Sequence, residues 1–161
     1  MTFYPHAMQE PLEGHSATGT LAQRNLIVLH ITAGPTARSA INTFKASVAP
    51  HRVSAHFVID RDGTVFQLLP VEDTAWHASA VNSRSVGIEH AAQPGLLPCT
   101  EEQYKASAAL VSWLCNLLGI PCDRLHVKGH SEASPQDHHV LCCSGALDAN
   151  RVVEMAKELK A

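Results

Sequence analysis

The most constraining feature of this sequence is an uninterrupted apolar run, Leu26-Ile27-Val28-Leu29, that ends on His30. Continuous apolar character predicts a strand that is buried on both faces, so we interpret residues 25–30 as an inner strand of a covered sheet. A second histidine, His130, closes another short apolar stretch at 124–130. Two histidines at strand ends suggest metal binding or acid–base chemistry.

Hydrophobic periodicity, turns and caps predict a mixed α/β fold. We expect strands and helices in this order: strand 25–30, helix 36–47, strands 54–60, 64–69 and 85–90, helix 100–118, strand 124–128 and helix 147–159. Arg61-Asp62-Gly63 predicts a hairpin turn, and Thr100 to Gln103 forms a capping box. We therefore expect one α/β domain over 24–161, with a mixed central β-sheet and helices on both faces, after an irregular lead-in over 1–23.

Composition excludes several classes of protein. The chain has 161 residues, 45% of them hydrophobic and 17% charged, as in an ordinary globular domain. A net charge of −3 gives no support for nucleic-acid binding. Apolar runs are too short for membrane insertion, and the start lacks the pattern of a signal peptide. We expect a cytoplasmic protein, or one that reaches a cell wall through phage lysis or a secretion machine.

The cysteines argue against a disulfide framework. There are five, an odd number, in a chain that lacks a signal-peptide pattern. Cys115 lies on a predicted helix, where a free cysteine packs as a small apolar side chain. A disulfide between Cys99 and Cys122 stays open as a weak alternative.

His30, His130 and Cys142 form the candidate metal site. Catalytic zinc takes three protein ligands and leaves one position open, and these residues offer two nitrogens and one sulfur. Because the three lie far apart in the sequence, the spacing alone is weak evidence. Surface or hydrogen-bonded histidines remain the alternative on residue types alone.

Five segments, in a fixed order, carry a resemblance to a known family. They are Ile27 to Gly34, Val53 to Gly63, Ala75 to Ala78, Asn82 to Glu89, and Gly129 to Glu132. Together they resemble the type 2 family of zinc-dependent N-acetylmuramoyl-L-alanine amidases, whose fold is shared with phage amidase lysozymes and peptidoglycan recognition proteins. The resemblance covers roughly residues 24–158.

The resemblance implies a Zn²⁺ ion held by His30, by His130 and by a third residue in the following loop. Cys142 and Cys143 compete for this third position, and Asp137 is a carboxylate alternative. We prefer Cys142, because the residues before it fit relatives with a longer loop.

The implied substrate is peptidoglycan or a muropeptide, cut at the amide between the lactyl group of N-acetylmuramic acid and L-alanine. Glu89 matches the family's catalytic glutamate, and burial at a strand end favours a raised pKa, as a general base needs. The alternative for Glu89 is a hydrogen bond to the backbone or to a ligand histidine. Many relatives carry Lys or Thr two residues before the third ligand; this chain has Val140 or Leu141 there, so His138 or His139 is the candidate replacement.

Five further residues are candidates for substrate binding: Thr32, Trp76, His77, Asn82 and Arg84. Trp76 and His77 are candidates to pack against a sugar or the peptide stem, although core packing is equally expected for Trp76. Arg84 is the candidate for a stem carboxylate. The competing function is a non-catalytic peptidoglycan-binding module of the same fold. The sequence decides neither between intact wall and soluble fragments nor whether an inhibitory partner protein exists.

Overall fold

A computed structural model describes residues 1–143 and 145–160 of the chain. Its elements are, in chain order, β1 (Met8–Gln9), β2 (Ser16–Ala17), the 3-10 helix η1 (Leu21–Gln23), β3 (Leu26–Ile31), α1 (Ala37–Ala46), β4 (Phe57–Ile59), β5 (Val65–Gln67), β6 (Thr74–Ala75), η2 (Ser79–Arg84), β7 (Ser85–His90), α2 (Glu101–Leu118), β8 (Val127–Gly129), α3 (His130–Ala133), η3 (Pro135–Asp137) and α4 (Ala149–Lys160).

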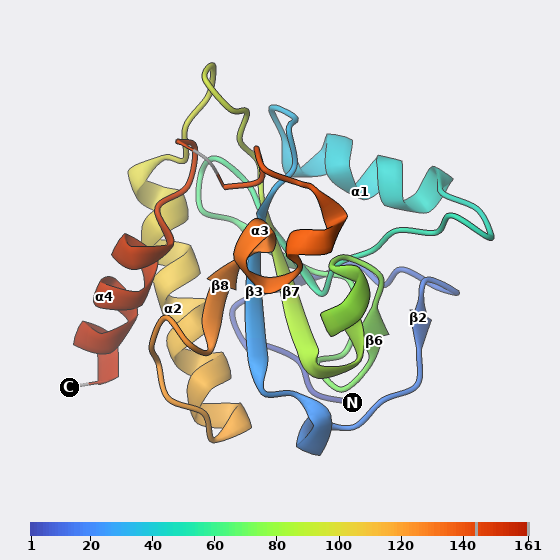
Figure 1. The fold of residues 1–161 in the computed structure, drawn as a ribbon, viewed down its shortest axis with the longest axis horizontal. Helices are drawn as coiled ribbons and strands as arrows, with labels where there is room; N and C mark the ends of the chain where they lie inside the picture. Colours follow the sequence, from blue (N-terminus) through green and yellow to red (C-terminus); the bar gives the residue numbers. More distant parts are fainter. Residues whose placement is uncertain (144, 161) are drawn as a thin grey trace.

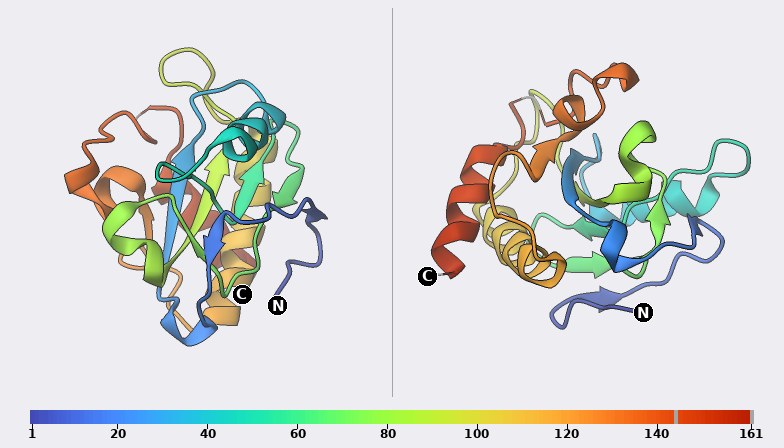
Figure 2. Two further views of the ribbon diagram at one scale, coloured as in Figure 1. Left: turned by 90° about the vertical axis from the view of Figure 1, so that its right-hand side faces the viewer. Right: turned by 60° about the horizontal axis from the view of Figure 1, so that its bottom comes forward.

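Six strands form the central sheet in the order β1-β5-β4-β7-β3-β8. Figure 1 shows β8, β3 and β7 side by side in this sheet. Strand β3 pairs in parallel with β7 and with β8, and β4 is parallel to β7 but antiparallel to β5. Helices α2 and α4 pack on one face, and α1 lies on the other side of the sheet (Figure 2). The predicted α/β fold with a mixed central sheet is therefore confirmed.

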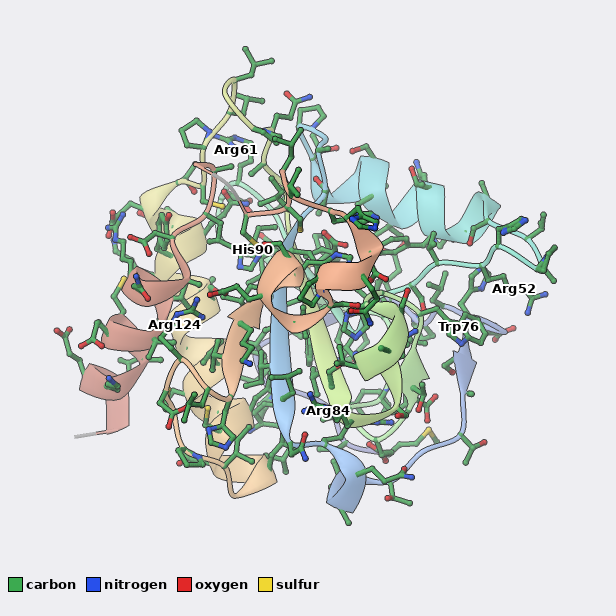
Figure 3. The ribbon with its side chains drawn as sticks, in the orientation of Figure 1. Arg52, Arg61, Trp76, Arg84, His90 and Arg124 are labelled. Carbon is green, nitrogen blue, oxygen red and sulfur yellow. The ribbon has the colours of Figure 1, made fainter. Side chains whose placement is uncertain are left out.

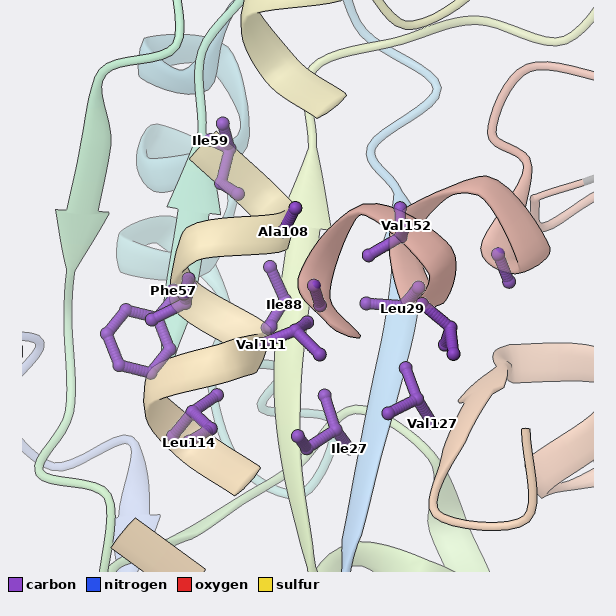
Figure 4. Packing of buried hydrophobic residues seen from close by; sticks show 14 of the residues in the cluster. Ile27, Leu29, Phe57, Ile59, Ile88, Ala108, Val111, Leu114, Val127 and Val152 are labelled. Atoms are coloured by element: carbon purple, nitrogen blue, oxygen red, sulfur yellow. The ribbon is translucent and has the colours of Figure 1, made fainter. Parts of the chain in front are cut away.

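The residues of β3 and β7 alternate between the two faces of the sheet, and one set enters the largest core. Alternate residues of both strands enter the large core beneath α2 and α4, which Figure 4 shows from close by. The core residues labelled there include Ile27, Leu29, Ile88, Val111 and Val152. Because neighbouring residues of a strand point to opposite faces, His30 and Glu89 point away from this core. They lie opposite each other in the β3–β7 register.

Side chains mark where α1 and α2 begin, and one glycine marks where α2 ends. The Thr36 side chain accepts a hydrogen bond from the Ser39 amide at the start of α1. Thr100 and Gln103 form the predicted capping box of α2. Gly119 ends α2 with φ 65°, a left-handed conformation that glycine adopts without steric cost.

The first 23 residues differ from the expected irregular lead-in. Strand β1 adds to the central sheet by pairing with β5, and β2 pairs with β6. Strands of two residues carry no readable periodicity, so the sequence does not reveal them. The expected loop over 129–145 also contains two short helices, α3 and η3.

The structure also bears on the predicted cysteine pairing and on membrane spanning. Cys99 and Cys122 are both free thiols, so the weak alternative of a disulfide between them is wrong. Within the described ranges, 1–143 and 145–160, no helix has both the length and the apolar character that a bilayer span requires.

Candidate metal centre and active site

The site residues meet because three parallel strands end at the same edge of the sheet. His30 is the penultimate residue of β3, Glu89 is the penultimate residue of β7, and His130 directly follows β8. Side chains at the carboxyl ends of neighbouring parallel strands converge on one crevice, where ligands of α/β proteins usually bind.

Two imidazoles and one thiol face a common point in this crevice. One donor atom each from His30, His130 and Cys142 lies within 4.8 Å of the others. The His30 Nδ1 atom is 3.8 Å from the Cys142 sulfur. A nitrogen and a sulfur that bind one tetrahedral zinc ion lie about 3.6 Å apart, given the usual bond lengths. The donor set therefore fits zinc in both chemistry and spacing.

In both His30 and His130, the outer ring nitrogen, Nε2, which points away from the common point, has a partner. His30 Nε2 lies 2.8 Å from His77 Nδ1, and His130 Nε2 lies 2.8 Å from the Asp137 carboxylate. These contacts orient both rings and leave each Nδ1 for the common point. Asp137 therefore contacts His130 on the side of the ring that points away from the common point. In this position its carboxylate orients His130 and is not placed as the third ligand.

The structure separates the two adjacent cysteines. The Cys142 sulfur lies beside His30, whereas the Cys143 thiol donates to the Leu29 carbonyl at 2.9 Å. The polar surroundings of the Cys142 sulfur, Cys143 first and then His130 and His30, outweigh burial and hold the pKa of the Cys142 thiol far below its ordinary value. A thiolate is the form that binds metal. This geometry favours Cys142 over Cys143 as the sulfur ligand.

Protonation of His130 follows from competing effects. Burial lowers its pKa, but hydrogen bonds to Cys142 and Asp137 outweigh burial, and the net pKa shift is upward. A bound cation would change this balance, because a histidine that binds a metal ion must offer an unprotonated ring nitrogen.

Glu89 places a buried carboxyl in the crevice, beside the metal-site residues. Burial raises its pKa from 4.5 to about 7, against the lowering effect of His30. Its Oε2 atom is buried and has no hydrogen-bond partner among residues 1–143 and 145–160. A buried, unpartnered carboxylate oxygen calls for a functional explanation, because such atoms are normally hydrogen-bonded.

A groove of ≈ 1140 Å³ contains most of the predicted site. The predicted residues that line it are His30, Thr32, Trp76, His77, Glu89, His130, His138, His139 and Cys142. An adjoining cavity of ≈ 680 Å³ is lined by Asn82 and shares several of these residues. The His139 ring stacks on the His130 ring, with centroids 4.5 Å apart.

Two residues predicted to bind substrate make structural hydrogen bonds within the protein. The Asn82 side-chain oxygen accepts from the backbone amides of His77 and Ala78, so it holds the turn before η2. Arg84 is the last residue of η2 and directly precedes β7, which places it about 16 Å from Glu89 at the usual rise of a strand. Its guanidinium donates to the Asn25 side chain, and Figure 3 shows it at the far end of the sheet from the crevice. Arg84 therefore lies apart from the predicted residues that the groove brings together.

Three residues contribute to the site in ways that the sequence analysis did not predict. Ser85 contacts His77 Nε2 at 3.1 Å. Gly87 leaves room for the His77 ring, because a Cβ there would lie 2.7 Å from it. Asp137 orients His130, as described above. Counting back from Glu89 in steps of two would have placed Ser85 and Gly87 on the same face of β7.

Comparison with known proteins agrees with this site. The sequence matches the N-acetylmuramoyl-L-alanine amidase family over residues 21–141. It is 34% identical over 100 residues to the 1,6-anhydro-N-acetylmuramyl-L-alanine amidase AmpD of Salmonella typhimurium, a match that covers 57% of this chain and 52% of the relative. The chain thus spans about half the length of the AmpD relatives it matches.

A second relative aligns over more of the chain. N-acetylmuramoyl-L-alanine amidase A of Achromobacter lyticus is 28% identical over 155 residues, which cover 84% of this chain and 85% of the relative. Among solved structures, a selenomethionine derivative of AmpD superposes with a TM-score of 0.75 at 24% identity, covering 95% of this chain and 96% of that one. The fold is therefore shared along nearly the whole chain. With three quarters of its length matched, the chain belongs to the N-acetylmuramoyl-L-alanine amidase family.

Proposed function

We propose that the protein hydrolyses the amide bond between the lactyl group of N-acetylmuramic acid and L-alanine, in peptidoglycan or its fragments. Family membership and the names of the relatives support this activity. One observation carries the proposal: two imidazole nitrogens and a sulfur face one point, beside a carboxyl with a pKa of about 7. This combination is typical of a zinc hydrolase.

His30, His130 and Cys142 would hold the zinc ion. Bound there, zinc would supply Lewis-acid activation of a water molecule and of the scissile carbonyl. The fit rests on the donor spacing and on the partners of the outer nitrogens, His77 and Asp137. Cys143 is held against the backbone and takes no part in this assignment.

Glu89 would act as the general base. Its carboxylate accepts the proton of the attacking water and returns it to the nitrogen of the departing L-alanine. The hydroxyl of the water stays on the lactyl carbonyl, so one molecule of water is consumed for each C–N bond broken. A pKa of about 7 suits both steps, because the group gains and loses a proton near neutral pH.

Trp76, Thr32 and His139 are the groove residues that we propose contact the substrate. The stacked position of His139 beside His130 makes it the better replacement for the missing oxyanion residue than His138. His77 is a weaker candidate for substrate binding, since both of its ring nitrogens already have partners.

Purified protein and a defined muropeptide test the proposal. The zinc-loaded protein should release a peptide with a free L-alanine amino terminus, and metal analysis should give one zinc per chain. Glu89→Gln should keep the zinc and lose about 10²–10⁴-fold in turnover, the usual contribution of a general base. Stoichiometric zinc without peptide release by the wild type would instead establish the alternative, a non-catalytic binding module.

The same assay addresses the biological role. Intact sacculi and soluble 1,6-anhydro muropeptides are offered separately at equal concentrations of the scissile bond. Preference for soluble fragments supports recycling of wall material, and preference for sacculi supports a bacteriolytic role.

A further inference from the structure

His77 contacts the candidate zinc ligand His30 from behind. The His77 Nδ1 atom lies 2.8 Å from His30 Nε2, and the two rings meet edge to face. One of these nitrogens must donate a proton and the other must accept it. The direction of this hydrogen bond decides which nitrogen of His30 carries its proton.

Ser85 gives the direction. Its hydroxyl has a single proton and donates it to the Val81 carbonyl at 2.7 Å. The same oxygen lies 3.1 Å from His77 Nε2, so it accepts from that nitrogen. A neutral imidazole has one N–H, so His77 Nδ1 carries no proton and accepts from His30 Nε2. The proton of His30 is thereby held on Nε2, and its Nδ1 lone pair faces Cys142.

The surrounding chain is shaped to hold the His77 ring in this place. A Cβ on Gly87 would lie 2.7 Å from the ring, so the missing side chain creates the space that the ring fills. The Asn82 side chain accepts a hydrogen bond from the backbone amide of His77, and this contact positions the backbone from which the His77 ring extends.

We propose that His77 and Ser85 are positioning residues that set the tautomer of His30 and present its Nδ1 atom to the metal. This inference rests on the zinc site proposed above. His77 then orients a metal ligand, a role different from substrate binding. Ser85 lies on the same face of β7 as Glu89 and contributes to metal affinity through His77. Groups that orient metal-bound histidines typically change metal affinity about 10–100-fold when removed.

Zinc affinity is the first test, measured on the full chain by competition with a chelator of known affinity. His77→Ala should weaken zinc binding about 10–100-fold, and Ser85→Ala should weaken it by a smaller factor. His77→Gln should recover part of the loss, because its side-chain oxygen can accept from His30 while its amide donates to Ser85. Circular dichroism checks that each variant folds.

Ser107→Ala is the matched control. Ser107 is as buried as Ser85 and also contacts a buried histidine, since its hydroxyl lies 2.9 Å from His90 Nε2. His90 contacts the backbone carbonyl of His30, not its ring. Ser107→Ala should therefore leave zinc affinity unchanged, and an equal loss in both serine variants would overturn the inference in favour of a general packing effect.

The second test is a spectroscopic one. Nitrogen-15 NMR of the zinc-loaded wild type should show the His77 ring protonated on Nε2; a proton on Nδ1 would overturn the proposal. Wild-type affinity in His77→Ala would overturn it while leaving the zinc site intact. Absence of zinc binding by the wild type would overturn both the site and this inference, so the two failures are distinguishable. If His77→Ala does not fold, Ser85→Ala and the NMR measurement decide the matter.

Discussion

The ionised form of Glu89 should destabilise the zinc-free protein, and removal of its charge should reveal this. Burial raises the pKa of Glu89 from 4.5 to about 7. Each tenfold change in proton affinity corresponds to about 1.4 kcal/mol, so the full effect is about 3 kcal/mol. This value is a ceiling, because the carboxyl lines a groove and is partly accessible to water.

The sign follows from the protons bound in each state. The folded carboxyl holds its proton more tightly than the unfolded one, so the folded protein binds more protons between the two pKa values. The free energy of unfolding therefore falls as the pH rises from about 4.5 to about 7, and this contribution stays lost at higher pH. Glu89→Gln, which is neutral at every pH, should match the wild type at pH below 4.5 and exceed its stability by up to about 3 kcal/mol at pH 8.

Urea unfolding of both zinc-free proteins at acidic and alkaline pH measures this difference. Glu132→Gln is the control of opposite sign: burial raises the pKa of Glu132, but hydrogen bonds from Arg124 and Gly129 outweigh it and the net shift is downward. Loss of that carboxylate should destabilise the protein at pH 8. A stability difference between wild type and Glu89→Gln that is the same at both pH values would refute the reasoning.

Three further outcomes are expected from the geometry. Cys142→Ala should lose zinc in metal analysis while Cys143→Ala keeps it; the reverse pattern would exchange their roles. Gly87→Ala should displace the His77 ring, weaken zinc binding and lower the free energy of unfolding by about 1–3 kcal/mol, as overpacking does; calorimetry with zinc titration checks both. Arg84→Ala should change the KM for muropeptide less than about twofold, because exposed side chains remote from a site have small effects.

The elements that carry the site could be predicted from the sequence because short local patterns determine them. The apolar run before His30 predicts a buried strand, and the capping box predicts where α2 begins. Carboxyl ends of parallel strands share an edge, so the convergence of His30 and His130 follows once the strands are paired. The type of sheet and the approximate place of the site were therefore predictable.

The contacts that orient the histidines were not readable in the same way. His77 reaches His30 across 47 residues, and the intervening chain folds through η2 before it returns in β7. Asp137 was considered as a ligand because residue type alone does not say which side of a histidine a carboxylate approaches. Arg84 was taken for a substrate contact because a guanidinium can bind a stem carboxylate, but residue type does not show that the length of β7 separates Arg84 from Glu89.

One face of β7 explains why the site has this composition. Val86 and Ile88 enter the core beneath α2 and α4, so the intervening residues all face the side where His30 lies. Those positions hold a hydroxyl at 85, no side chain at 87 and a carboxyl at 89, in that order towards the crevice. In the roles proposed above, the hydroxyl and the vacant space at 87 position the His77 ring behind the metal ligand His30, and the carboxyl of Glu89 acts as the general base. A substitution that shifted the register of β7 by one residue would bury the carboxyl in the apolar core, so the function and the fold depend on the same alternation.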